Sequence, residues 1–235
     1  MIRVDFSLPA EFQEIPLGGD FDVAWAEAVL PGEREPVATV RDDEWPSDEA
    51  AGAMRRVSCF LSDVGVVYAA NCLQVFEGRL SLGSLAVAIV DYPYGRSATT
   101  AARGAVQAVL GSRGEGWSGA VVQAPAGPAA VFTGGQTQVL SAPFSSFSSD
   151  GGPGRAEVPT AQFHAMIPIP PPEAGGAGLH MCLMVFSTSR VAHWEKCYAP
   201  VAAGILRSLR FTAVDGTTVN PADRAGDAHD GGGRP

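Results

Sequence analysis

Two distant stretches of this chain share the same sequence pattern, and this internal repeat constrains the fold more than any other feature. The first is GSLAVAIVDYPYGRSATTAARGAVQAVLGSR at residues 83–113, and the second is GLHMCLMVFSTSRVAHWEKCYAPVAAGILRSLR at residues 178–210. Each has an apolar run typical of a buried strand, then a short polar turn, then a helical pattern. A second β-type run precedes each stretch, so hairpins rather than crossovers join the strands. The pattern predicts an α+β fold, an antiparallel β-sheet made of two hairpin–helix units with helices packed on its faces, which is an α/β/α sandwich.

Further patterns predict the elements of the first half of the chain. Alternation over residues 4–8 predicts a strand that ends at Pro9, and helical spacing predicts a helix over residues 20–30. Ser47 can cap a second helix, which carries one apolar stripe along its length. That stripe consists of Ala50, Ala53, Met54, Val57, Phe60, Leu61 and Val64. Strands are expected at residues 66–76 and 80–92, joined by a short turn that contains glycine.

Glycine and proline divide the region that follows. A helix is expected at residues 99–110, with Gly111 at its end. Short strands are expected at residues 121–123, 131–133 and 136–140, separated by the turns PAGP and GG. A hairpin of residues 162–169 and 179–186 should complete the sheet.

The final helix should run from just after Ser189 to about Leu209. Its apolar spacing predicts one buried stripe, made of Val191, Trp194, Tyr198, Val201, Ala202, Ile205 and Leu209. Pro200 must either kink this helix or restart it as a first-turn residue.

Composition divides the chain into one domain and a tail. Residues 1–212 should form a single α+β domain, interrupted around residues 141–155 by a Ser/Gly-rich segment that is expected to be a mobile loop. Residues 213–235 have little to bury and are expected to be disordered.

Charge and cysteine content restrict the partners and the compartment. With a net charge of −9, the surface should repel phosphate backbones and anionic lipid, so nucleic acid and membrane insertion are not expected. No apolar run approaches the length of a membrane span. Four cysteines in a chain of 235 residues without an export signal are expected to be reduced thiols in the cytoplasm. A protein partner is therefore expected.

The motifs of common enzyme classes are missing from the sequence. It contains no G-x-S-x-G elbow, no phosphate-binding G-x-x-x-x-G-K-[ST] loop and no H-E-x-x-H. No cofactor and no catalytic residue is predicted. The alternative is an enzyme of another type, Cys-dependent or a simple hydrolase, in which Cys59 or Cys72 pairs with His164.

One stretch has residues of the types that bind zinc. His180 and Cys182 are two apart, and His193 and Cys197 are four apart, so each pair shares one face of its element. Structural zinc sites are usually built on Cys-x₂₋₄-Cys turns, which this chain lacks, and free cysteine is common in protein cores. We therefore expect these four residues to pack without binding a metal.

Two surface segments carry residues that are typical of interfaces. Asp91, Tyr92, Tyr94 and Arg96 follow a buried strand, where loops often bind partners. The alternative is a rigid turn whose rings cover the edge of the sheet. In the Ser-rich segment, Phe144 and Phe147 either anchor the loop or dock another chain.

The two ends of the domain resemble a known group of proteins. The segment LMVFSTSRVAHWEKCYAPVAAGILRSLRF and the opening VDFSLPAEFQEIPL are similar to the PsbP/Mog-like α/β/α sandwich group. That group includes lipoproteins of LpqN type and domains associated with type VII secretion. The resemblance implies a non-catalytic binding or accessory protein, associated with a secretion or multi-subunit assembly, with no shared catalytic residues to carry over.

Overall fold

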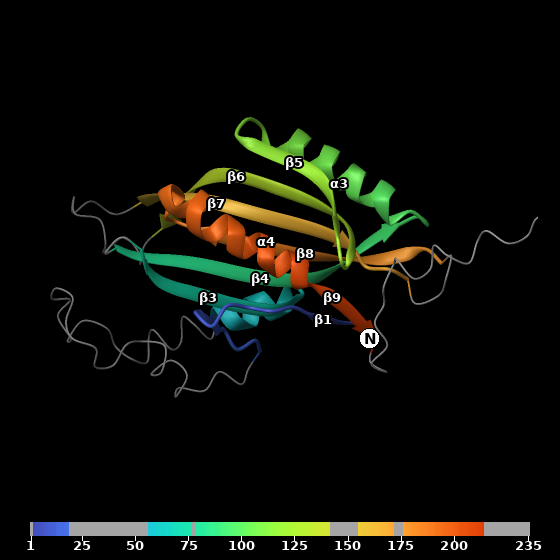
Figure 1. Cartoon of the computed structure of the whole chain (residues 1–235), viewed down its shortest axis with the longest axis horizontal. Helices are drawn as coiled ribbons and strands as arrows, with labels where there is room; N and C mark the ends of the chain where they lie inside the picture. The colour runs from blue at the N-terminus through green and yellow to red at the C-terminus, as the bar shows by residue number, and fades with distance from the viewer. Residues whose placement is uncertain (1, 19–55, 77–78, 142–154, 172–175, 214–235) are drawn as a thin grey trace, which may run out of the picture.

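The computed structural model of the chain describes residues 2–18, 56–76, 79–141, 155–171 and 176–213 (Figure 1). The strands are β1 (Ile2–Asp5), β2 (Phe12–Glu14), β3 (Val66–Phe76), β4 (Arg79–Tyr94), β5 (Trp117–Ala124), β6 (Gly127–Ser141), β7 (Arg155–Pro168), β8 (Gly178–Thr188) and β9 (Arg210–Ala213). The helices are α3 (Ala98–Arg113) and α4 (Ala199–Ser208), and residues 56–63 are also helical. The helix expected at residues 20–30, nearly all of the Ser/Gly-rich segment and the tail beyond Ala213 lie outside the described residues.

A seven-stranded antiparallel sheet in the order β2-β3-β4-β8-β7-β6-β5 organises the molecule. β8 is the middle strand, with β4 and β7 paired on either side of it. β1 and β9 form a separate antiparallel pair. The prediction of an α+β fold with a large antiparallel sheet is confirmed.

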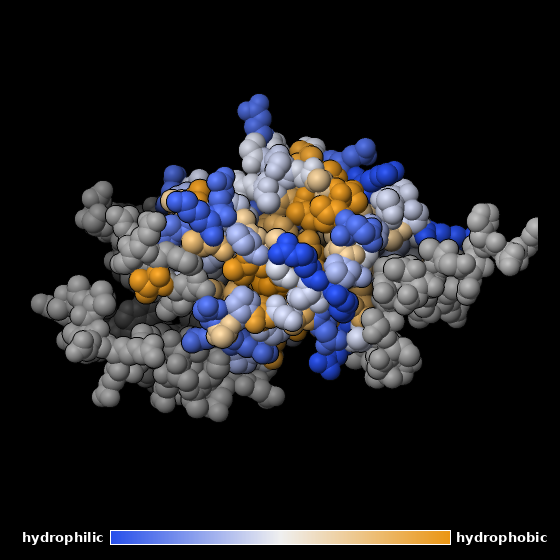
Figure 2. All heavy atoms as spheres, viewed as in Figure 1, coloured by the Kyte–Doolittle hydropathy of each residue, from blue (hydrophilic) through white to orange (hydrophobic). Residues whose placement is uncertain are grey.

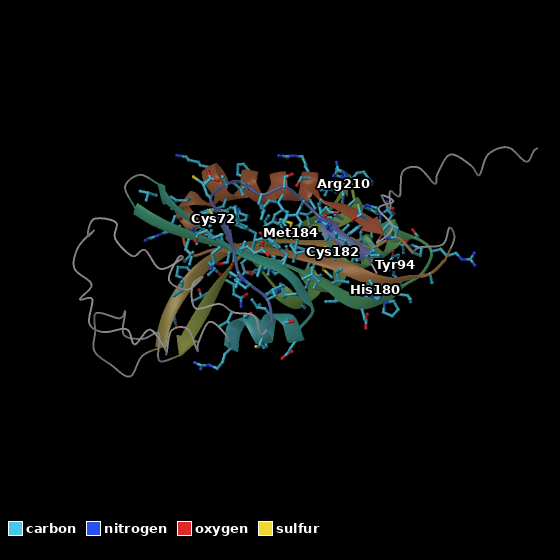
Figure 3. All side chains as sticks on the ribbon, turned by 90° about the horizontal axis from the view of Figure 1, so that it is seen from below. Cys72, Tyr94, His180, Cys182, Met184 and Arg210 are labelled. Carbon is cyan, nitrogen blue, oxygen red and sulfur yellow. The ribbon has the colours of Figure 1, made fainter. Side chains whose placement is uncertain are left out.

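The two faces of the sheet carry different helices, because successive side chains of a strand point to opposite faces. Leu85 of β4 and both Met184 and Phe186 of β8 lie in one buried cluster with Ile205 of α4 and Phe211 of β9. Figure 1 accordingly shows α4 and β9 in front of the sheet. Figure 3, turned by 90°, shows the helical segment of residues 56–63 on the side of the sheet away from α4. We call the face under α4 the front face and the other the back face.

The back face carries α3 over strands β5, β6 and β7. Ala102 and Ala105 of α3 are buried against Ala130 and Phe132 of β6. The small alanine side chains allow the helix to lie close to the sheet. α3 begins at Ser97, whose side chain accepts a hydrogen bond from the Thr100 N–H.

α3 extends beyond Gly111, where the sequence predicts its end. It continues through Gly111 and ends at Gly114, whose φ of 75° only glycine adopts easily. A Cβ at Gly111 would meet nothing within 4 Å, so this glycine lies on the open side of the helix and does not stop it.

β6 is one continuous strand, so the predicted turn at Gly134 and Gly135 is wrong. Gly134 pairs with Trp117 of β5, and a Cβ on Gly134 would lie 2.4 Å from the indole Cδ2. The glycine therefore allows the indole to lie against the backbone of the neighbouring strand. The pair of glycines predicts a turn, whereas Gly134 makes room for a ring within the strand.

The N-terminal segment also differs from its prediction. The strand stops at Asp5, and the Ser7 N–H donates to the side chain of Ser208 instead of continuing the ladder. β2, which was not predicted, then pairs with β3 at the edge of the sheet.

The final helix is broken. A 3₁₀ turn (Val191–His193) and a π-helical turn (Trp194–Tyr198) precede α4, which has Pro200 in its first turn. Proline lacks an N–H, so it restarts the helix, as one of the two predicted alternatives has it. Val191 is 47% exposed and Tyr198 only 1%, while Trp194 is partly buried against the core. Tyr198, rather than Val191 or Trp194, is thus the central buried residue of this segment.

Candidate functional site

The candidate zinc residues on β8 occupy two different environments. Cys182 pairs with Ile89 of β4 and Ile167 of β7 and is fully buried among apolar side chains under α4, as Figure 3 shows. Burial raises the pKa of the Cys182 thiol to about 12. Cys182 therefore packs as a small apolar residue of the core.

His180 lies two residues along the same strand and turns to an acidic neighbour. Its Nδ1 is 3.1 Å from Oδ1 of Asp91, the residue that pairs with it across β4 and β8. Cys197 packs against the core from the π-helical turn, and His193 precedes that turn. Within the described ranges, no group of three or more His, Cys, Asp and Glu side chains is placed to hold a metal ion.

Tyr94, the last residue of β4, contacts the chain at the ends of β7 and β8. The Tyr94 hydroxyl donates a hydrogen bond to the carbonyl oxygen of Ile169. The Tyr94 ring also occupies the space beside Gly178, where a Cβ would overlap its carbon atoms. Burial raises the pKa of Tyr94, which keeps its hydroxyl a donor. This aromatic residue therefore ties the end of β4 to the hairpin of β7 and β8.

The other predicted interface residues are spread along the same segment. Asp91 and Arg96 are exposed and Tyr92 is half-buried. Only Asp91 among them makes a contact described above, the one with His180. Phe144 and Phe147 lie outside the described residues.

A pairing of Cys72 with His164 is excluded by the sheet. Cys72 pairs with Gly83 on the front face, where a Cβ on that glycine would meet the rings of Phe186 and Tyr198. His164 lies on the back face against Trp117, and two strands separate β3 from β7, a span of roughly 14 Å. Burial, with a smaller contribution from Glu11, also raises the pKa of Cys72 to about 11, so this thiol is not an activated nucleophile.

His164 belongs instead to a closed ring of contacts at the end of α3. Arg113 donates to the Gln136 side chain at 3.0 Å and lies over the Trp117 ring, 4.9 Å from its centroid. Trp117 meets the His164 ring edge-on, with 5.0 Å between centroids. The His164 Nε2 and the Gln162 Oε1 are 3.0 Å apart.

Two buried side chains close this ring. Gln162 donates its amide N–H to the Thr160 hydroxyl at 3.2 Å, and Thr160 donates to the Gln136 carbonyl oxygen at 2.8 Å. Because the Gln162 amide nitrogen faces Thr160, its oxygen faces His164 and accepts from Nε2–H. Burial and, to a smaller extent, the nearby Arg113 lower the pKa of His164 to about 4, so the imidazole is neutral at pH 7. The ring of contacts fastens α3 to three strands and offers no activated base.

The helical segment of residues 56–63 turns an apolar stripe to solvent. Its buried residue is Ser58, whose hydroxyl donates to the carbonyl oxygen of Pro16 at 2.6 Å and lies 3.1 Å from that of Gly18. Val57 and Phe60 in this helix and Val64 in the turn directly after it, spaced i, i+3 and i+7, are 46%, 63% and 48% exposed. We call these three residues the exposed stripe.

The sequence predicts the spacing of this stripe correctly but not its environment. Such a stripe ordinarily faces a core, but Val57, Phe60 and Val64 are exposed and Leu61 is half-buried. The inner side of the helix is instead held by a hydroxyl that satisfies backbone carbonyls, which periodicity of apolar residues cannot indicate. The remaining members of the predicted stripe lie outside the described residues.

In comparisons with protein-family models, curated proteins and solved structures, nothing matches this chain. The part of the chain that the structure describes contains no helix with the length and apolar character needed to cross a membrane.

Proposed function

We propose that this chain is a non-catalytic binding or accessory protein that docks a protein partner on the exposed stripe. The observation that carries the proposal is the exposure of Val57 and Phe60 on one side of a helix that is anchored through Ser58, together with the exposed Val64 in the turn that follows. Single exposed apolar residues are ordinary, but three on one narrow helical seam form the pattern by which helices recognise one another. Val67 at the start of β3, 48% exposed, extends the apolar surface.

The partner that fits this surface is an amphipathic helix with basic flanks. A seam with i, i+3 and i+7 spacing packs against the apolar stripe of another helix. The net charge of −9 would steer a basic partner to the molecule and repel an acidic one. The exposed Asp91 and the predicted partner residues around it offer a second contact surface for the same partner.

The predicted architecture and compartment support this role. Packing of α3 and α4 against opposite faces of the sheet favours the PsbP/Mog-like α/β/α sandwich that the chain ends resemble. Service in a secretion or multi-subunit assembly is the role which that resemblance implies. All four cysteines are free thiols in the structure, which is consistent with a reducing cytoplasm.

Affinity capture with matched variants tests the proposal. The tagged full chain, its Phe60→Asp variant and its Val75→Asp variant are used as baits in extract from the native host, and retained proteins are identified by mass spectrometry. Val75 is a suitable control because it is 69% exposed but lies on β3, away from the stripe. A charge at either exposed site should leave the fold intact.

The expected result is a protein retained by the unmodified chain and by Val75→Asp but lost with Phe60→Asp. The purified candidate should then bind the unmodified chain directly in calorimetry, with an affinity at least ~10-fold weaker for Phe60→Asp. Equal retention by all three baits would show that the stripe is not the docking surface.

A further inference from the structure

The hairpin of β5 and β6 lies within the longest uncharged part of the chain. Residues 116–149 contain no Lys, Arg, Asp, Glu or His, in a protein where 17% of all residues are charged. Both strands fall in this range. An uncharged surface strand requires an explanation, because solvent-facing strand positions are usually polar or charged.

β5 is also an edge strand. It ends the strand order, and none of the described strands pairs with its outer side. Figure 1 shows it as the outermost strand of the sheet, beside α3. Its exposed side chains are uncharged: Ser118, Ala120 and Val122 lie on one face, and Gln123 lies on the other. In Figure 2, apolar atoms gather on the part of the front face where β5 and β6 run in Figure 1.

At the opposite edge of the same sheet, β2 has features that prevent another strand from pairing with it. β2 has only three residues, one of which is Glu14, and Pro16 follows shortly after it. Short strands, charges and prolines are the usual means of preventing strand addition. β5 has eight residues, with neither charge nor proline among them, so its row of backbone donors and acceptors is unprotected.

We infer that the outer edge of β5 pairs antiparallel with β5 of a second copy of this chain, which joins the two sheets across a two-fold axis. An antiparallel strand can pair with itself, so a single edge satisfies both copies. The charge distribution favours a second copy of this chain as the molecule that pairs with β5. Two molecules that each carry −9 repel one another over most of their surfaces, and the uncharged hairpin is where that repulsion is weakest.

The outer side of α3, which lies beside β5, does not obstruct this pairing. Its charged residues are Arg103 and Arg113, and Arg113 is already held by Gln136 and Trp117. The exposed residues Gly104, Ala108 and Gly111 leave the outer side of the helix smooth, so two copies of α3 can approach one another beside the joined strands. Backbone pairing along β5, with this helix contact, forms the dimer.

The oligomeric state of the full chain tests the inference. Analytical ultracentrifugation at micromolar concentrations should give twice the 24.3 kDa mass of one chain. The double variant Ala120→Lys/Val122→Lys places like charges opposite one another across the joined edge, and the dimer Kd should rise at least ~10-fold. Val75→Lys and Phe60→Asp serve as controls, because both positions are exposed and lie away from β5. Circular dichroism checks that every variant is folded.

Each outcome decides the matter. A dimer that is lost with the double Lys variant and kept by both controls supports pairing through β5. A monomer of the unmodified chain at these concentrations overturns the inference. A dimer that survives the double variant, or that is lost with Phe60→Asp, places the interface elsewhere and also overturns it.

Discussion

Single residues of the broken final helix show how a backbone detail decides which ring enters the core. Apolar spacing places both Trp194 and Tyr198 in the buried stripe, but the two residues at the ends of the π-helical turn of residues 194–198 are buried to different extents. Tyr198 lies on Phe186, with 5.5 Å between ring centroids, and its hydroxyl donates to the Ser81 hydroxyl at 2.6 Å. Both partners of that hydrogen bond are about 1% exposed.

Substitution of these two rings should therefore rank in an order that the sequence alone does not give. Tyr198→Ala should lower the free energy of unfolding by about 3–5 kcal/mol, because it leaves a cavity under α4. Tyr198→Phe should cost about 1–2 kcal/mol for the lost hydrogen bond. Trp194→Ala, at a half-buried site, should cost less than Tyr198→Ala in urea unfolding. The reverse order would contradict the assigned packing.

The pH dependence of stability should contain a contribution from His164. Its pKa is about 4 in the folded chain against 6.5 ordinarily, so between these values the unfolded state binds more protons. The free energy of unfolding should then fall as the pH falls through this window. Since solvent reaches part of the ring, we expect a loss on the order of 1 kcal/mol between pH 7 and pH 5. Urea unfolding of His164→Gln should show a shallower pH dependence, and parallel curves would contradict the assignment.

At the scale of elements, the long central strands and most of α3 could be predicted from the sequence, because continuous apolar runs and helical spacing are strong local signals. The single length of β6 could not be predicted. Gly134 resembles a turn residue until Trp117, seventeen positions earlier in the sequence, is seen to lie on it. Pro200 predicts the break in the final helix, whereas no residue pattern in the sequence predicts the π-helical turn before it.

Two neighbouring glycines provide a test of this account of β6. Gly134→Ala should lower the free energy of unfolding by about 1–3 kcal/mol, because its Cβ would meet the Trp117 ring at 2.4 Å. Gly135→Ala is the matched control, since its Cβ would lie 3.6 Å from the nearest atom, the Thr160 carbonyl oxygen. Thermal unfolding of both variants should separate them, and equal values would contradict the close packing of ring on backbone.

At the scale of the whole molecule, burial of the thiols should control their reactivity. Denatured chain without reductant should give four titratable thiols, since no disulfide is present among the four cysteines. In the native protein Cys59, which is exposed, should react first. Cys72 and Cys182, buried with pKa values raised to about 11 and 12, should react only on unfolding. A thiol reagent followed by mass spectrometry distinguishes them, and rapid labelling of Cys182 would contradict the assigned core.

The candidate site could be predicted only in part. The i, i+3 and i+7 spacing of Val57, Phe60 and Val64 is visible in the sequence, but apolar periodicity indicates burial and does not say against what. Ser58 decides the outcome, because its hydroxyl turns the other side of the helix toward the backbone at Pro16 and Gly18. Hydrogen bonds between segments forty residues apart leave no periodic signal.

Hydrogen–deuterium exchange of the full chain, alone and bound to the partner found by capture, tests the docking proposal most directly. Complex formation should slow exchange in peptides that cover residues 56–67, because a helix packed on the exposed stripe removes their backbone from water. Peptides from the middle of β8 should exchange at the same slow rate in both states. If exchange at residues 56–67 is unchanged in the complex, the exposed stripe is not where this protein binds its partner.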